Sequence, residues 1–137
     1  MDNKKTHMEM IQGIINRMAG NSFSLKGWAV TLVAGIFALA GKETDKMYFI
    51  IAYVPIIVFW FLDAYYLLQE RLYRALYNKV RMMKEEEIDF NMNTSIDELK
   101  SEKNTYVSSL FSKTEFWFYV PLALLVAGII ILTHFNK

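Results

Sequence analysis

The chain of 137 residues contains no cysteine. This absence excludes disulfide bonds, a thiolate nucleophile and any cysteine-based metal site. The sequence also has no large excess of charge of either sign, because its formal net charge is +1. Proteins that bind nucleic acid usually carry a strongly basic surface, so we do not expect nucleic acid among the partners.

Catalytic motifs are missing as well. The sequence contains no glycine-rich phosphate loop, no GxSxG and no HExxH. Its two histidines, His7 and His134, are expected on opposite sides of a membrane, so they are not expected to share a metal ion. The acidic run at 85–87 is more typical of a solvated charge cluster than of a cation site. We therefore expect neither enzymatic activity nor a cofactor.

What the sequence does contain is apolar residues, which make up 54% of the chain and are gathered into blocks. The block at 47–68 holds 22 residues and a single formal charge, Asp63. A helix of that length is about 33 Å long and crosses a hydrocarbon core of about 30 Å. Further blocks at 23–41 and 116–135 are also candidate spans. The sequence predicts an all-α integral membrane protein with three transmembrane helices and a small helical cytosolic part.

The predicted organisation has four segments. They are an N-terminal amphipathic helix (1–22), a transmembrane hairpin (23–68), a cytosolic helical segment (69–114) and a C-terminal transmembrane helix (115–137). Gly20, Asn21 and Ser22 predict a turn that ends the first helix. The apolar face of that helix either packs on the cytosolic segment or lies in the membrane interface. Pro55 is expected to kink the second span.

The cytosolic continuation of the second span carries an apolar stripe that needs a partner. The stripe consists of Leu72, Leu76, Val80 and Met83. Its partner is either a later segment of the same chain or another protomer. A short helix after Ser95, where the sequence matches a capping box, is the candidate within the chain. Glu70 and Arg74 are expected to form an i, i+4 pair on the exposed face.

Asp63 is the most informative polar residue. A charged side chain at the centre of a spanning helix costs about 2.5–3.5 kcal/mol on insertion scales, and less near the interface. Two interpretations remain open. Asp63 either pairs with Lys26 or Arg71 close to the cytosolic interface, or it lines a water-filled path or an oligomer contact.

The first span also carries a row of small residues. They recur at steps of three and four residues: Gly27, Thr31, Ala34, Gly35, Ala38 and Gly41. Such a row lets another helix approach closely. That helix belongs either to the second span or to another protomer, and Gly35 is the representative contact residue.

The distribution of basic residues predicts the orientation. Eleven lysines and arginines precede the first span or lie between the second and third spans, a twelfth, Lys26, lies at the near edge of the first span, and three lie on the other side. Basic residues concentrate on the cytoplasmic side of membrane proteins. The N-terminus and residues 69–114 are therefore expected in the cytoplasm, and the C-terminus outside it.

Residues 21–41 (NSFSLKGWAVTLVAGIFALAG) and 59–81 (FWFLDAYYLLQERLYRALYNKVR) form a hydrophobic hairpin that runs directly into a charged cytosolic helix. This layout resembles the SLATT-type and other small transmembrane effectors of bacterial anti-phage systems. The resemblance implies a location in the bacterial inner membrane. It also implies a soluble sensor protein that triggers the effector to compromise the membrane. The third span departs from a simple two-span effector.

We therefore expect an inner-membrane effector that forms homo-oligomers and perturbs or permeabilises the lipid bilayer. The small-residue row, Asp63, unpaired amphipathic faces on the cytosolic helices and the missing catalytic groups motivate this hypothesis. The alternative is a membrane anchor or adaptor that recruits a soluble partner through residues 69–112.

The topology gives a first prediction. A reporter fused after Lys137 is expected to give an extracytoplasmic signal, because three spans place the two termini on opposite sides of the membrane. Paired reporters, one active only in the cytoplasm and one only outside it, make the measurement. A cytoplasmic signal would require an even number of spans and contradict the three-span topology.

Overall fold

The protein is described by a computed structural model over residues 2–40, 47–94 and 105–135. Its ordered elements over these ranges are helical: α1 (Asp2–Ala40), α2 (Met47–Ile51), α3 (Tyr53–Arg81), a 3₁₀ turn (Glu85–Glu87), α4 (Tyr106–Leu110) and α5 (Lys113–Phe135). Within these ranges three stretches are long and apolar enough to cross a membrane: Asn3–Leu39, Phe49–Arg81 and Lys113–Phe135. This confirms the predicted all-α fold with three transmembrane helices.

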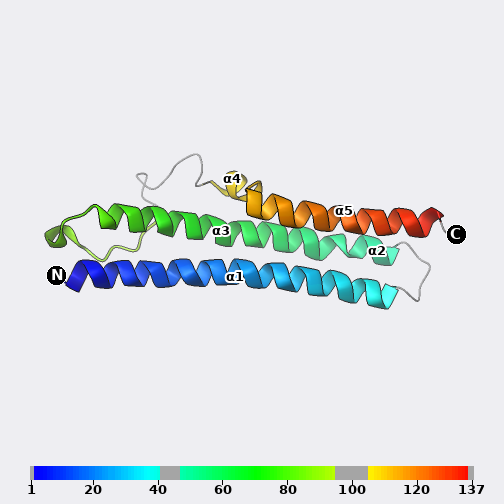
Figure 1. Ribbon diagram of the computed structural model, residues 1–137, viewed down its shortest axis with the longest axis horizontal. Coiled ribbons are helices and arrows are strands. Elements are labelled where there is room, and N and C mark those ends of the chain that lie inside the picture. Colours follow the sequence, from blue (N-terminus) through cyan, green and yellow to red (C-terminus); the bar gives the residue numbers. More distant parts are fainter. Residues whose placement is uncertain (1, 41–46, 95–104, 136–137) are drawn as a thin grey trace.

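The molecule is an elongated bundle whose two halves differ (Figure 1). α1 and α3 run side by side along the length of the molecule, and α5 packs beside α3 over only one half. That half is therefore a three-helix bundle, whereas the other half is a helical pair. The N-terminal and C-terminal ends of the chain lie at opposite ends of the molecule.

α1 is one continuous helix, so the turn predicted at Gly20, Asn21 and Ser22 is wrong. A glycine inside a helix costs about 1 kcal/mol relative to alanine, and tertiary packing readily offsets that cost. Here Ser22 is buried and faces α3, where it donates a hydrogen bond to Asp63. Packing on α3 therefore continues through the point where the local sequence favours a turn.

Pro55 disturbs the second span, as the sequence predicts. The α-helix is interrupted at Ala52, between α2 and α3. Proline lacks the N–H that would bond to the carbonyl four residues earlier, and its ring crowds that carbonyl. The Ala52 N–H donates instead to the carbonyl of Phe49 at 3.2 Å, which is a tighter i to i−3 bond.

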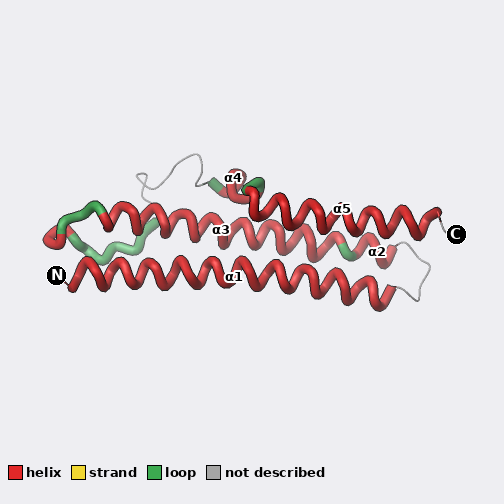
Figure 2. The backbone as a smooth tube through the Cα atoms, in the orientation of Figure 1, coloured by secondary structure: helices red, strands yellow, loops and turns green. Residues whose placement is uncertain are grey.

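The two-helix half has its own apolar core. Ile11 and Ile15 of α1 are buried against Leu76 and Val80 of α3. The segment after α3 closes this core, because Ile88 and Met92 pack against it. Figure 2 shows that segment as a loop that folds back toward α1.

This core identifies the partner of the apolar stripe. The prediction that a later segment of the chain covers it is confirmed in part, because Ile88 and Met92 pack there, but the earlier helix α1 also covers it through Ile11 and Ile15. The alternative in which the N-terminal helix packs on the segment 69–114 is confirmed for the packing itself, since α1 lies against the C-terminal part of α3. The short helix predicted after Ser95 lies outside the described residues. The predicted Glu70–Arg74 pair is present, with Arg74 Nη2 2.9 Å from Glu70 Oε1.

The two-helix half gives a second prediction. Leu76→Ala should destabilise it by about 3 kcal/mol, because the substitution leaves a cavity in a core where Leu76 is 2% exposed. Backbone amides in 8–18 and 72–83 should then exchange hydrogen for deuterium faster in lipid nanodiscs. Met10→Ala is the matched control, since Met10 is 48% exposed. Equal exchange in both variants would contradict the packing.

Candidate functional site

The most distinctive site is a buried polar cluster at the level where α5 begins. Its centre is the ammonium group of Lys26 on α1. Lys26 Nζ lies 2.6 Å from Asp63 Oδ2 on α3 and 3.1 Å from Glu115 Oε1 on α5. It also donates to Ser22 Oγ at 3.0 Å. One lysine therefore connects all three spanning helices.

Asp63 is fully buried and well provided with donors. Its Oδ1 accepts a hydrogen bond from the Ser22 hydroxyl, and its Oδ2 accepts from Tyr119 Oη at 2.9 Å as well as from Lys26. The interpretation in which Asp63 pairs with Lys26 is confirmed. Arg71, the other proposed partner, donates instead to Ser108 Oγ at 3.4 Å. In this conformation Asp63 does not line a water-filled path.

Glu115 is the member of the cluster that the sequence did not reveal. It is fully buried, and its Oε1 accepts from Lys26. Its backbone N–H donates to Ser112 Oγ at 3.4 Å. The second carboxyl oxygen, Oε2, is buried without a hydrogen-bond partner. Burying a polar atom without a partner is costly, so this oxygen is the least satisfied atom of the cluster.

The surroundings of the cluster are aromatic. The ring of Tyr119 stacks on Trp60 with centroids 6.0 Å apart and planes 7° apart. Lys26 Nζ lies 5.9 Å and 6.0 Å from the ring centroids of Phe118 and Tyr119. Trp60 Nε1 donates to the carbonyl of Leu110 at 2.8 Å, which ties α3 to α4. Aromatic walls exclude water and so strengthen the electrostatic contacts inside.

The small-residue row of the first span lies elsewhere. α1 packs on the bundle through Ala29 and Val33, which are buried. Gly35 and Gly27 are exposed on α1. A Cβ added at either glycine would meet no atom within 4 Å. The alternative in which this row packs against the second span is therefore wrong.

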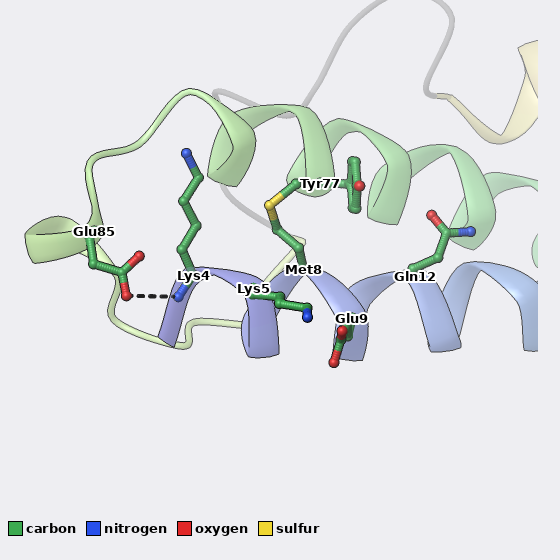
Figure 3. Close-up of a pocket in the computed structure, with 7 residues that line it drawn as sticks. All are labelled: Lys4, Lys5, Met8, Glu9, Gln12, Tyr77 and Glu85. Atoms are coloured by element: carbon green, nitrogen blue, oxygen red, sulfur yellow. Dashed lines mark hydrogen bonds between the residues drawn. The ribbon is translucent and has the colours of Figure 1, made fainter. Parts of the chain in front are cut away.

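A hollow of about 410 Å³ lies at the far end of the two-helix half. It is lined by Lys4, Lys5, Met8, Glu9 and Gln12 of α1, by Tyr77 of α3 and by Glu85 (Figure 3). Glu85 Oε1 accepts from the backbone N–H groups of Asn3 and Lys4 at 3.1 Å and 3.3 Å. These groups are otherwise unsatisfied donors at a helix start, so Glu85 caps α1 from a distance in the chain. The lining combines charged side chains with the apolar surfaces of Met8 and Tyr77.

Metal chemistry finds no support in the described parts of the chain. No group of three or more histidine, cysteine, aspartate or glutamate side chains there is arranged to hold a metal ion. His7 is near the start of α1 and His134 is near the end of α5. Figure 1 shows the start of α1 and the end of α5 at opposite ends of the molecule. Comparisons with protein-family models, curated proteins and solved structures find no match to this chain.

The cluster gives a third prediction. Lys26→Met should lower the free energy of unfolding in lipid by about 3 kcal/mol, because Asp63 and Glu115 would lose the ammonium group that both contact. Controlled unfolding in nanodiscs measures the change. Arg17→Met removes an exposed charge from the same helix and should change stability little. If the two variants are equally stable, Lys26 does not connect the three spans.

Proposed function

We propose that the protein is a membrane effector whose copies associate in the bilayer and permeabilise it. The observation that carries this proposal is the outer face of α1. Six small residues recur there at alternating steps of four and three residues, and all six are exposed: Gly20, Ser24, Gly27, Thr31, Ala34 and Ala38. We call this set the small-residue face.

The small-residue face is turned away from the protein's own bundle. It lies about half a helical turn from Ala29 and Val33, which contact the other helices. Alternating steps of four and three are the spacing of helices that pack along a heptad repeat. Small side chains at those positions let two backbones approach closely, which is how helices associate where lipid supplies no hydrophobic driving force.

A second copy of the same helix is the partner that fits this face. Phe23 and Trp28 flank it and are 81% and 63% exposed. With Ser24, Gly27 and Thr31 they line a groove of about 340 Å³. Two copies that present the same face form a self-complementary contact. Each copy therefore presents both a groove and the aromatic side chains that flank it.

Permeabilisation is the activity that such association supports. Three spans are too few to enclose a channel, so a conducting path requires several copies. The layout resembles SLATT-type effectors, in which a soluble sensor triggers damage to the bacterial inner membrane. By the same proposal the N-terminus faces the cytoplasm. The sequence suggested unpaired amphipathic faces on the two extramembrane helices as a further reason for self-association. These faces cover each other within one copy, so they do not support the proposal.

The second candidate function is an anchor or adaptor that recruits a soluble protein. The hollow beside Glu85 and Tyr77 favours it, because it lies at the end of the molecule farthest from α5. Met10 and Met82 are 48% and 80% exposed on the two-helix half. An adaptor would keep its function when unrelated spanning helices replace its own, whereas an effector would not.

The fourth prediction tests the small-residue face. Gly27→Leu should abolish association and reduce dye leakage from liposomes at least tenfold, because the leucine side chain separates the two backbones. The open space at Gly27 means that the single copy should still fold. Mass measurement of native-membrane particles gives the copy number, and liposome leakage gives the activity.

Gly13→Leu is the matched control. Gly13 is also exposed on α1 with open space around its Cα, but it precedes the predicted transmembrane segment. This variant should associate and leak as the original chain does. Leakage that persists in a Gly27→Leu variant shown to be a single copy would overturn the effector proposal. A single copy without leakage, even with its sensor present, would favour the adaptor.

A further inference from the structure

The polar cluster contains more acid than base. Two carboxyl groups, Asp63 and Glu115, contact the one ammonium group of Lys26, and both acids are fully buried. If both acids were ionised, the site would carry a net negative charge inside a spanning bundle. Such a charge is very costly unless another positive charge neutralises it.

The hydrogen bonds assign the two acids different roles. Asp63 accepts from three side chains, those of Ser22, Lys26 and Tyr119. Hydrogen bonds to a carboxylate favour its charged form. Glu115 accepts from Lys26 alone among the described side chains, and its Oε2 has no partner. The negative charge is therefore best placed on Asp63.

A proton on Glu115 resolves both the charge and the unsatisfied oxygen. A protonated carboxyl gains an O–H donor. Asp63 and Glu115 both contact Lys26 Nζ, at 2.6 Å and 3.1 Å, so the two carboxyl groups lie near each other. With that proton the cluster holds one positive and one negative charge, and the added O–H is a donor for the neighbouring carboxylate.

We propose that Glu115 is a proton-binding site that fastens α5 to the α1–α3 hairpin, and that loss of this proton loosens α5. In the described part of the chain, the ionisable groups of this cluster are Lys26 from α1, which contacts Glu115 directly, and Asp63 from α3 and Tyr119 from α5, which are joined to each other beside it. Once the proton leaves, two carboxylates compete for one ammonium group. Their repulsion then acts directly between α5 and α3.

Exchange of this proton requires a route to water. Lys26 provides it, because its side chain is 18% exposed while both acids are at 0%. The site lies at the first turn of α5 and not in the middle of the span. By the predicted orientation the route opens to the cytoplasmic side. The proton site does not depend on self-association, and it would stand if the effector proposal failed.

Infrared difference spectroscopy on the full chain in lipid nanodiscs tests the proposal. The carbonyl stretch of a protonated carboxyl is separate from the bands of carboxylates. Above pH 6.5 exposed acids are ionised, since their pKa values lie near 4. We expect one protonated-carboxyl band there that disappears as the pH is raised. No such band in the original chain would overturn the proposal.

Variants test whether the band comes from the pair of acids in the cluster. Glu115→Gln should lose it, and Glu9→Gln, which changes an exposed acid on α1, should retain it. Asp63→Asn should also lose it, because the remaining acid then balances Lys26 and ionises. Glutamine mimics the protonated acid, so Glu115→Gln should keep α5 attached at high pH. Asp63→Asn removes one of the two competing carboxylates, so the attachment of α5 should then no longer weaken as the pH rises.

The fluorescence emission of Trp60 reports whether α5 is attached to α3. Trp60 stacks on Tyr119, whereas Trp28 and Trp117 are exposed. With Trp28 and Trp117 replaced by phenylalanine, the emission of Trp60 should shift as the proton leaves, and Glu115→Gln should remove that shift. The same titrations in sodium and in potassium salts should agree. A shift that follows sodium concentration at constant pH would identify an alkali cation as the bound charge and overturn the proton assignment.

Discussion

The contact between Lys26 and its two buried acids is the interaction on which the bundle depends. Aliphatic packing between spanning helices is weakly specific, since lipid tails are as apolar as the side chains that they contact. A charged contact is different, because its partners are costly to separate inside the bilayer. Lys26 touches an acid on each of the other two spans. The cluster therefore sets the register of α1, α3 and α5 together.

Much of the fold was predictable because apolar runs of spanning length have few alternatives. Residues 47–68 and 116–135 were recognised by length and composition. The turn expected at Gly20 to Ser22 failed because glycine is a local signal, whereas continuous packing of α1 on α3 is a tertiary effect. The partner of the Leu76 stripe also depends on which helices are neighbours, and periodicity does not carry that information.

The site was predictable in part. A lone aspartate in a span requires a cation, and Lys26 was one of two candidates. Glu115 was missed because it directly precedes the uncharged run, where an acid usually faces water. The spacing of Glu115 and Tyr119 was the available signal, since residues four apart share a helical face. The orientation of the small-residue face was not predictable, because the bundle-facing side of α1 also uses a small residue, Ala29.

The continuity of α1 has a mechanical consequence. A helix of 39 residues is a rod about 58 Å long, and it has no internal break at which bending concentrates. Lys26 fixes this rod to its neighbours at a point roughly two-thirds of the way along it. The rod contacts α3 on both sides of Lys26, through Ile11 and Ile15 on one side and through Ala29 and Val33 on the other. A sideways displacement at the Glu85 end is therefore expected to move α1 and α3 together as one stiff body.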